Sequence, residues 1–265
     1  MNRRLGFFAA GLGLVVALWV VGVALPLTQG YPSVFDWLRD HRITDKPKYD
    51  RQKLHADLVA AGFEFGQQAH VRIFKRERQL ELWMRQDGGR FALFRSYAIC
   101  TYSGTLGPKL AEGDKQSPEG FYRVAKAQLN PVSRHHLAFN IGFPNAFDRN
   151  LGRTGSALMV HGGCSSVGCY AMTDAQIDEI YAVLEAALDS GQSEVDVAIF
   201  PFKLTEMALQ AEAGSSWLPF WRNLKQGFDL FEQQHLPPKV AACKDTYVFG
   251  DAAAAPDCAP ITGWV

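Results

Sequence analysis

The pattern of apolar and polar residues begins with an uncharged apolar run close to the N-terminus. The run covers residues 5–27 and follows the basic pair Arg3 and Arg4. As a helix it would be about 34 Å long, enough to cross the hydrocarbon core of a bilayer. A basic start before an apolar run is also typical of a secretory signal peptide, for which residues 22–24 offer a cleavage site. Residues 1–30 are therefore predicted to be a signal peptide or an N-terminal membrane anchor, and cleavage stays open.

The basic pair also predicts on which side of a membrane the rest of the chain lies. Positive charges flanking a membrane segment stay in the cytoplasm, so everything after about residue 30 is expected outside it. A buried core helix is the other interpretation of the run, but such helices rarely lack polar residues over this length.

Further along the chain, short apolar stretches with period-two alternation predict strands. Val71 and Ile73, then Leu80 and Leu82, alternate on either side of the charged residues 75–78, which is typical of a β-hairpin with a charged tip. Other strands are expected at residues 91–101, 121–129, 157–160 and 195–200.

Apolar residues at helical spacing predict helices at both ends of the chain and one in its middle. The spacing of Leu54, Leu58 and Ala61 favours an early helix. The middle helix is expected to begin after Thr173, which can form a capping box with Gln176. Two further helices are predicted at residues 205–213 and 219–234, before a Pro/Ala-rich tail with little helical or strand pattern.

Two segments rich in turn residues are predicted to be loops. They are residues 103–117 and residues 130–155. A long structureless segment inside a compact domain is usually functional, so both are expected to form walls of a binding site. The element order predicts a mainly β (α+β) catalytic domain over residues 66–203, after a helical lead-in at 31–65 and before a helical, cysteine-bearing extension at 204–265.

Composition narrows the class of protein without naming one. The 265 residues are 48% hydrophobic and 20% charged, which excludes a disordered or fibrous chain. The 27 basic and 27 acidic residues balance, so the chain lacks the overall excess of positive charge that is typical of nucleic-acid-binding proteins. Without residues 1–30, which hold two arginines and no carboxylate, 25 basic residues face 27 acidic ones, a balance of −2.

Five cysteines suit an oxidising compartment, but the number is odd. Cys243 and Cys258 lie close together in the tail and are predicted to form a disulfide. Of Cys100, Cys164 and Cys169, at least one must be free or bridged to another molecule. We expect Cys100 to be a core strand residue and Cys164 to be a buried or tolerated thiol.

The stretch from His161 to Cys169 combines residues suited to nucleophilic catalysis. It reads His-Gly-Gly-Cys-Ser-Ser-Val-Gly-Cys, so the His and the second Cys can meet across a tight turn. Glycines let the backbone approach a ligand, and backbone N–H groups of such a turn can form an oxyanion hole. A free thiol needs a neighbouring imidazole or helix N-terminus to become a thiolate at neutral pH. These features indicate a Cys–His acyl-transfer site that requires no cofactor.

Two other interpretations of these residues stay open. Cys164 and Cys169 could form a small disulfide, or both could bind zinc with His161, although no Cys-x-x-Cys pair supplies a fourth ligand. His135 and His136 are neighbours in a loop, and we expect surface or packing roles for them.

Several motifs, in order, resemble the YkuD-type L,D-transpeptidases of bacterial cell walls. His161-Gly162 followed by Ser166-Val167-Gly168-Cys169 is similar to the family's His-Gly … Ser-x-Gly-Cys signature, and the segment at 117–121 is similar to its Thr-Pro-x-Gly-x-Phe segment. Residues 104–109, 140–145 and 160–174 are most similar to the YafK-like branch. The resemblance covers about residues 71–202.

The resemblance implies a β-sandwich or barrel-like catalytic fold and a set of site residues. Cys169 would be the nucleophile and His161 its general base, oriented by the backbone carbonyl of Gly162. Backbone N–H groups of Val167, Gly168 and Cys169 would bind the oxyanion. We add four candidate substrate contacts, Lys109, Arg153, Tyr170 and Ser166.

Departures from the general family pattern refine the expected reaction. Val167 stands where many members have a second His, and Ala171 replaces the usual Arg. Both agree with the YafK-like branch, whose members are associated with the amide bond between meso-diaminopimelate of peptidoglycan and an outer-membrane lipoprotein. The implied function is cleavage of such links or L,D-transpeptidation in the periplasm. The partners would be peptidoglycan stem peptides, with or without lipoprotein, and the inner membrane if residues 5–27 remain. A peptidoglycan-binding protein without catalytic activity is the alternative.

Overall fold

A computed structural model of the chain describes residues 50–264. The apolar run at 5–27 and most of the helical lead-in therefore lie outside the described residues. None of the helices at residues 50–264 combines the length and the apolar character of a membrane-spanning segment. The described lead-in consists of helix α3 (Arg51–Ala60), which Asp50 caps by accepting a hydrogen bond from the Lys53 N–H.

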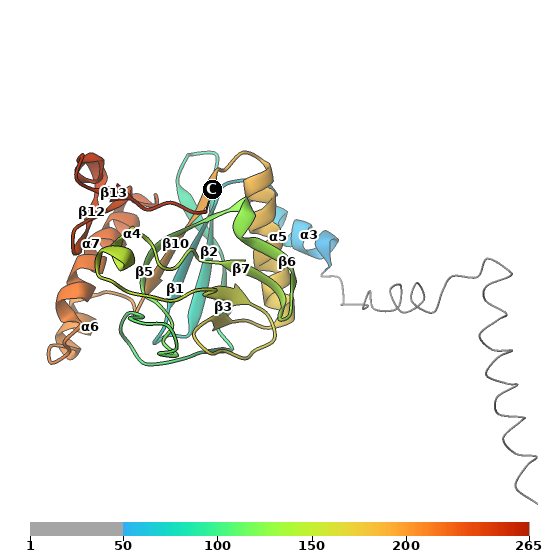
Figure 1. The fold of residues 1–265 in the computed structure, drawn as a ribbon. Coiled ribbons are helices and arrows are strands. Elements are labelled where there is room, and N and C mark those ends of the chain that lie inside the picture. Colours follow the sequence, from blue (N-terminus) through green and yellow to red (C-terminus); the bar gives the residue numbers. More distant parts are fainter. Residues whose placement is uncertain (1–49, 265) are drawn as a thin grey trace, which may run out of the picture. The chain divides into compact units, whose positions relative to one another are not determined.

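A five-stranded sheet forms the centre of the fold (Figure 1). Its order is β3-β2-β1-β10-β5, with β1 and β10 parallel and all other neighbours antiparallel. The strands are β1 (Ala69–Phe74), β2 (Gln79–Arg85), β3 (Phe91–Ala98), β5 (Gly120–Ala125) and β10 (Glu194–Phe200). The predicted hairpin is confirmed as β1 and β2.

A second five-stranded sheet carries the residues of the glycine-rich turn. Its order is β4-β9-β8-β7-β6, and β8 and β9 are parallel neighbours. The strands are β4 (Thr101–Tyr102), β6 (Leu129–Ser133), β7 (His136–Asn140), β8 (Met159–His161) and β9 (Tyr170–Ala171). Helix α5 (Asp174–Asp189) follows directly, and Thr173 and Gln176 form the predicted capping box at its start.

Two apolar cores lie on opposite faces of the central sheet. Because side chains alternate along a strand, Val71 and Ile73 of β1 pack in the core shared with the second sheet and α5, whereas Phe74 lies in the other core. The second core is completed by Trp221 and Phe228 of α7. The extension consists of α6 (Glu206–Ala211), α7 (Leu218–Gln234) and a small sheet of β11 (Val240–Cys243), β12 (Thr246–Phe249) and β13 (Ala259–Pro260). It therefore shares a core with the central sheet.

The mainly β fold class is confirmed, but two expectations about irregular segments are wrong. Residues 130–155 hold most of β6, all of β7 and helix α4 (Ala146–Asn150), and the tail contains three strands. The pattern of β6 was misleading because it includes Pro131 and the exposed Val132, and it gains its order from pairing with β7. The tail strands are held by the disulfide Cys243–Cys258, the pairing that the sequence suggested.

Candidate active site

The parallel pairing of β8 and β9 brings His161 and Cys169 to one face of the second sheet. Val160 lies opposite Tyr170, and His161 lies opposite Ala171. Continuing this register by one residue places Cys169 beside Met159, whose N–H lies 3.4 Å from the Cys169 Sγ atom. Val160 and Tyr170 are fully buried in the core. Strand alternation therefore places His161 and Cys169 on the opposite face, as diagonal neighbours.

A disulfide between Cys100 and Cys164 ties the glycine-rich turn to the segment between β3 and β4. The Cα atoms of the two cysteines are 5.1 Å apart. Both earlier expectations, a core thiol at 100 and a tolerated thiol at 164, are therefore wrong. The pairing also excludes a Cys164–Cys169 bridge and removes Cys164 as a zinc ligand. Sequence could not show it, because the two cysteines are 64 positions apart.

Two further hydrogen bonds hold the turn against the start of α5. The Gly163 N–H donates to Asp174 Oδ1 over 2.8 Å, and the Cys164 N–H donates to the Met172 carbonyl over 3.2 Å. With the disulfide, these contacts fix the turn from both sides. No group of three or more His, Cys, Asp or Glu residues in the described range is arranged to bind a metal ion.

The His161 ring is set up to accept a proton at Nε2. Its Nδ1 atom lies 2.6 Å from the carbonyl oxygen of Gly162. A carbonyl only accepts, so Nδ1 carries the proton and the Nε2 lone pair is left as a base. Burial lowers the pKa of His161, and the charge of His135 lowers it further. The hydrogen bond to Gly162 raises this pKa, but by less than burial lowers it. The ring is therefore neutral at neutral pH.

The two histidines of the β6–β7 hairpin have different environments. The exposed His135 packs its ring on His161, with centroids 4.6 Å apart and planes inclined by 32°. His136 turns inward, where its Nε2 atom lies 2.6 Å from Asp178 Oδ1 on α5. The packing role predicted for both is correct, but His135 packs on the candidate base itself. Nothing in the sequence indicated that contact.

Cys169 is the free cysteine among the described residues. Its thiol lies 3.6 Å from the Ala157 carbonyl oxygen, to which it donates, and it accepts from the Met159 N–H. Burial raises the pKa of the thiol, while the Met159 contact and the charge of Lys109 act in the opposite direction. The resting pair is therefore a neutral thiol and a neutral imidazole, which is the starting state for general-base catalysis.

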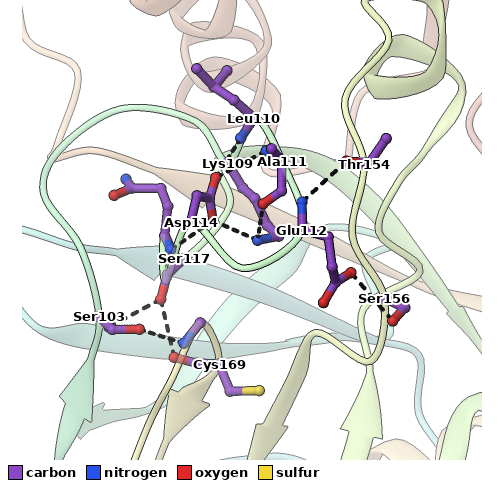
Figure 2. Close-up of polar contacts among 12 residues, drawn as sticks. Ser103, Lys109, Leu110, Ala111, Glu112, Asp114, Ser117, Thr154, Ser156 and Cys169 are labelled. Carbon is purple, nitrogen blue, oxygen red and sulfur yellow. Dashed lines mark hydrogen bonds and ion pairs between the residues drawn. The ribbon is translucent and has the colours of Figure 1, made fainter.

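The loop at 103–117 is folded around the carboxylate of Asp114 (Figure 2). Asp114 accepts hydrogen bonds from the N–H groups of Leu110, Ala111 and Gln116 and from Lys109 Nζ, the last over 2.6 Å. Burial raises the pKa of Asp114, but these donors outweigh it and hold the pKa at about 2. The Lys109 ammonium is paired with the Asp114 carboxylate, and the Lys109 side chain is only 5% exposed. Direct substrate contact by Lys109, expected from the sequence, is therefore not supported.

A buried ion pair anchors the base of the same loop. Lys75 Nζ donates to Glu119 and to the carbonyl oxygens of Gly107 and Ser117, all within 3.0 Å. Trp221 of α7 donates to the other Glu119 oxygen over 2.9 Å. Lys75 belongs to the predicted charged tip of the β1–β2 hairpin, and it is fully buried because these acceptors compensate its charge.

Two other expected substrate contacts are internal to the protein. Tyr170 is fully buried and donates to the Pro118 carbonyl over 2.7 Å. Arg153 donates to Asp148, a completely buried residue of α4. Direct substrate contact by either residue is therefore not supported, since Tyr170 is fully buried and the Arg153 side chain is only 7% exposed and paired with Asp148.

Three serine hydroxyls surround the backbone of Cys169. Ser166 and Ser117 both donate to the Cys169 carbonyl oxygen, over 2.7 and 3.1 Å, and Ser103 accepts from the Gly168 N–H. Figure 2 shows Ser103 and Ser117 beside Cys169. Ser166 was a candidate from the sequence, but Ser103 and Ser117 were not. Ser117 is the first residue of the Ser-Pro-Glu-Gly-Phe motif, which could have identified it as a site residue. No motif in the sequence pointed to Ser103.

Comparisons with known proteins agree on one family. The model of the L,D-transpeptidase catalytic domain, YkuD, matches residues 68–197. The Escherichia coli K12 protein named "Putative L,D-transpeptidase YafK" is 48% identical over 183 residues, which are 69% of this chain and 74% of that protein. Its counterpart in Escherichia coli O157:H7 matches equally well.

Among solved structures, two bacterial proteins are similar over about half their length. The helical cell shape determining protein Pgp2 from Campylobacter jejuni has a TM-score of 0.40 and 21% identity, over 56% of this chain and 55% of that one. Bd1075 from Bdellovibrio bacteriovorus has a TM-score of 0.35 and 20% identity, over 52% of each chain.

Proposed function

Since this chain belongs to the YkuD family of L,D-transpeptidase catalytic domains, we propose that it is a cysteine acyltransferase or amidase of peptidoglycan. The proposed bond is an amide formed by meso-diaminopimelate in a stem peptide. One observation carries the proposal: Cys169 has a free thiol on the same sheet face as His161, whose Nδ1 is committed to Gly162.

The first step forms a thioester on Cys169. His161 Nε2 removes the thiol proton as the sulfur attacks the amide carbonyl carbon, and the carbonyl electron pair moves onto oxygen. Backbone N–H groups of the turn stabilise this oxyanion, each by about 3–4 kcal/mol. When the carbonyl re-forms, the carbon–nitrogen bond breaks and the leaving amine takes the proton from His161.

The second step depends on the acceptor. Water attacking the thioester, with His161 removing its proton, regenerates the thiol and completes an amide hydrolysis. This outcome would release a lipoprotein attached to diaminopimelate. The amine of a second diaminopimelate would give a cross-link instead. Val167 and Ala171 replace residues typical of the wider family and support the hydrolytic outcome as the first candidate.

A location outside the cytoplasm is part of the proposal. Peptidoglycan lies there, and two disulfides form readily in an oxidising compartment. Residues 5–27 would deliver the chain to the periplasm and, if retained, anchor it in the inner membrane.

The test is an incubation of the full-length protein with purified sacculi, with and without attached lipoprotein peptides. Products are followed by mass spectrometry, with Cys169→Ala as the control. Release of free lipoprotein peptide supports the amidase, and new diaminopimelate–diaminopimelate links support the transpeptidase. Binding to sacculi without any product would support the non-catalytic alternative. Product formation that survives in Cys169→Ala would overturn the thioester mechanism.

A further inference from the structure

Serine side chains fix two backbone groups near the nucleophile, the Gly168 N–H and the Cys169 carbonyl, which lie on either side of the peptide unit that joins these two residues. The Gly168 N–H donates to Ser103 Oγ, and the Cys169 carbonyl accepts from Ser117 and Ser166. Ser103 and Ser117 are themselves joined twice, because the Ser103 N–H donates to Ser117 Oγ over 3.2 Å and the Ser117 N–H donates to the Ser103 carbonyl over 3.0 Å.

Fixing both groups determines the orientation of the peptide unit between them. That unit joins Gly168 to Cys169 and carries the Cys169 N–H. Its plane is set by ψ of Gly168 and φ of Cys169, which cannot change freely while the flanking groups stay bonded. Gly168 adopts a φ of +113°, which a residue with a side chain rarely adopts. The direction of the Cys169 N–H is therefore held in advance of substrate binding.

The same contacts decide which N–H groups of the turn are available to an oxyanion. We expected Val167, Gly168 and Cys169 to donate together. Within residues 50–264, however, Gly168 already donates to Ser103, whereas the N–H groups of Val167 and Cys169 have no hydrogen-bond acceptor. The structure thus reduces the expected set of three donors to two.

We propose that Ser103 is a positioning residue of the oxyanion hole. By accepting the Gly168 N–H, its hydroxyl orients the neighbouring Cys169 N–H toward the carbonyl oxygen of the group that acylates the thiol. Ser117 and Ser166 hold the other side of the same residue. Ser103 does not touch the reacting atoms in this arrangement, and it acts through the peptide unit of the nucleophile.

Two reactions of the same thiol distinguish a role of Ser103 in the oxyanion hole from a general loss of order in the site. p-Nitrophenyl acetate acylates Cys169: the sulfur adds to the acetyl carbon, an oxyanion forms, and p-nitrophenolate leaves. Iodoacetamide alkylates Cys169: the sulfur displaces iodide at a saturated carbon, and no oxyanion forms. Neither reagent contains peptidoglycan, so the inference is testable even if the sacculus assay shows no product.

The experiment measures both rates on full-length protein for Ser103→Ala, Ser103→Thr and the control Ser193→Ala. Ser193 is an exposed serine in the turn between α5 and β10. In Ser103→Ala, the acylation rate is expected to fall by about 10- to 100-fold while the alkylation rate changes by less than about 2-fold. Ser103→Thr keeps the hydroxyl and should restore most of the acylation rate.

Two results would overturn the proposal. An equal fall of both rates in Ser103→Ala would show that the thiol itself, and not the oxyanion, had been affected. An unchanged acylation rate would show that the Gly168 contact has no effect on the donors. Mass spectrometry of proteolytic peptides identifies Cys169 as the acetylated residue in each variant, so a reaction elsewhere on the surface is not counted.

Discussion

His161 is oriented by its own neighbour in the chain, because its Nδ1 atom lies 2.6 Å from the carbonyl oxygen of Gly162. In Ser-His-Asp triads the same position is held by a carboxylate, whose negative charge stabilises the imidazolium. A carbonyl fixes the ring and its tautomer but supplies no full charge. The Gly162 hydrogen bond by itself raises the pKa of His161, but burial outweighs it, so the imidazole stays neutral until a proton is transferred in the reaction.

The first prediction concerns the charge state of the thiol. Since burial raises the pKa of Cys169 and lowers that of His161, a thiolate–imidazolium pair is not the resting state. The rate of alkylation by iodoacetamide should therefore rise with pH to a midpoint above that of a free cysteine, about 8.5. A rate that has already reached its plateau at pH 7 would contradict this.

The second prediction concerns the ring packed on the base. A protonated His135 disfavours a proton on His161 and so lowers the pKa of that ring. His135→Phe keeps a ring in the same place and removes the charge. The acidic limb of kcat/KM should move to higher pH, by up to about half a unit. His135→Ala serves as the comparison without a ring, and a move to lower pH in the Phe variant would refute the assignment.

The third prediction concerns the disulfide that holds the glycine-rich turn. Cys100 and Cys164 are 64 positions apart, and Cys243 and Cys258 are 15 apart. The entropy that a cross-link removes from the unfolded chain grows with the loop it closes. Replacing Cys100 and Cys164 together by Ser should lower the free energy of unfolding by about 2–4 kcal/mol, more than the same change at the tail pair. Urea unfolding of both double variants measures this, and the reverse order would contradict it.

The glycine-rich turn was predictable because its chemistry is local in sequence. His161, Cys169 and the capping box after them fall within one short stretch, so spacing and motif resemblance were sufficient. The same was true of the β1–β2 hairpin, whose alternation is regular. In both places, the residues that predict the structure lie in one continuous segment of the sequence.

Contacts between distant segments were not predictable. The disulfide Cys100–Cys164, the Lys75–Glu119 pair and the Ser103–Gly168 contact each join residues more than 40 positions apart. Lys109 and Arg153 had the right chemistry for substrate carboxylates, but in the folded protein they form ion pairs with Asp114 and Asp148. Residue type alone could not reveal those partners.

The fourth prediction concerns the ion pair below the active-site loop. Lys75 and Glu119 both have fully buried side chains. Removing one partner leaves the other as an uncompensated buried charge, so Lys75→Met should lower the free energy of unfolding by about 3–5 kcal/mol. The double variant Lys75→Met/Glu119→Gln should lose less than the sum of the two single variants. Additive losses in this double-mutant cycle would show that the pair is not coupled.

The central claim is that Cys169 carries the acyl group, and trapping that intermediate tests it most directly. Full-length protein is mixed with soluble stem-peptide fragments from sacculi and quenched in acid, and the intact mass and the Cys169 peptide are measured by mass spectrometry. The account predicts an adduct with the mass of the acyl fragment on Cys169. It also predicts that His161→Ala slows formation of the adduct by about 10²- to 10⁴-fold. Turnover of the same fragments without an adduct on Cys169, or with the adduct on another residue, would contradict it.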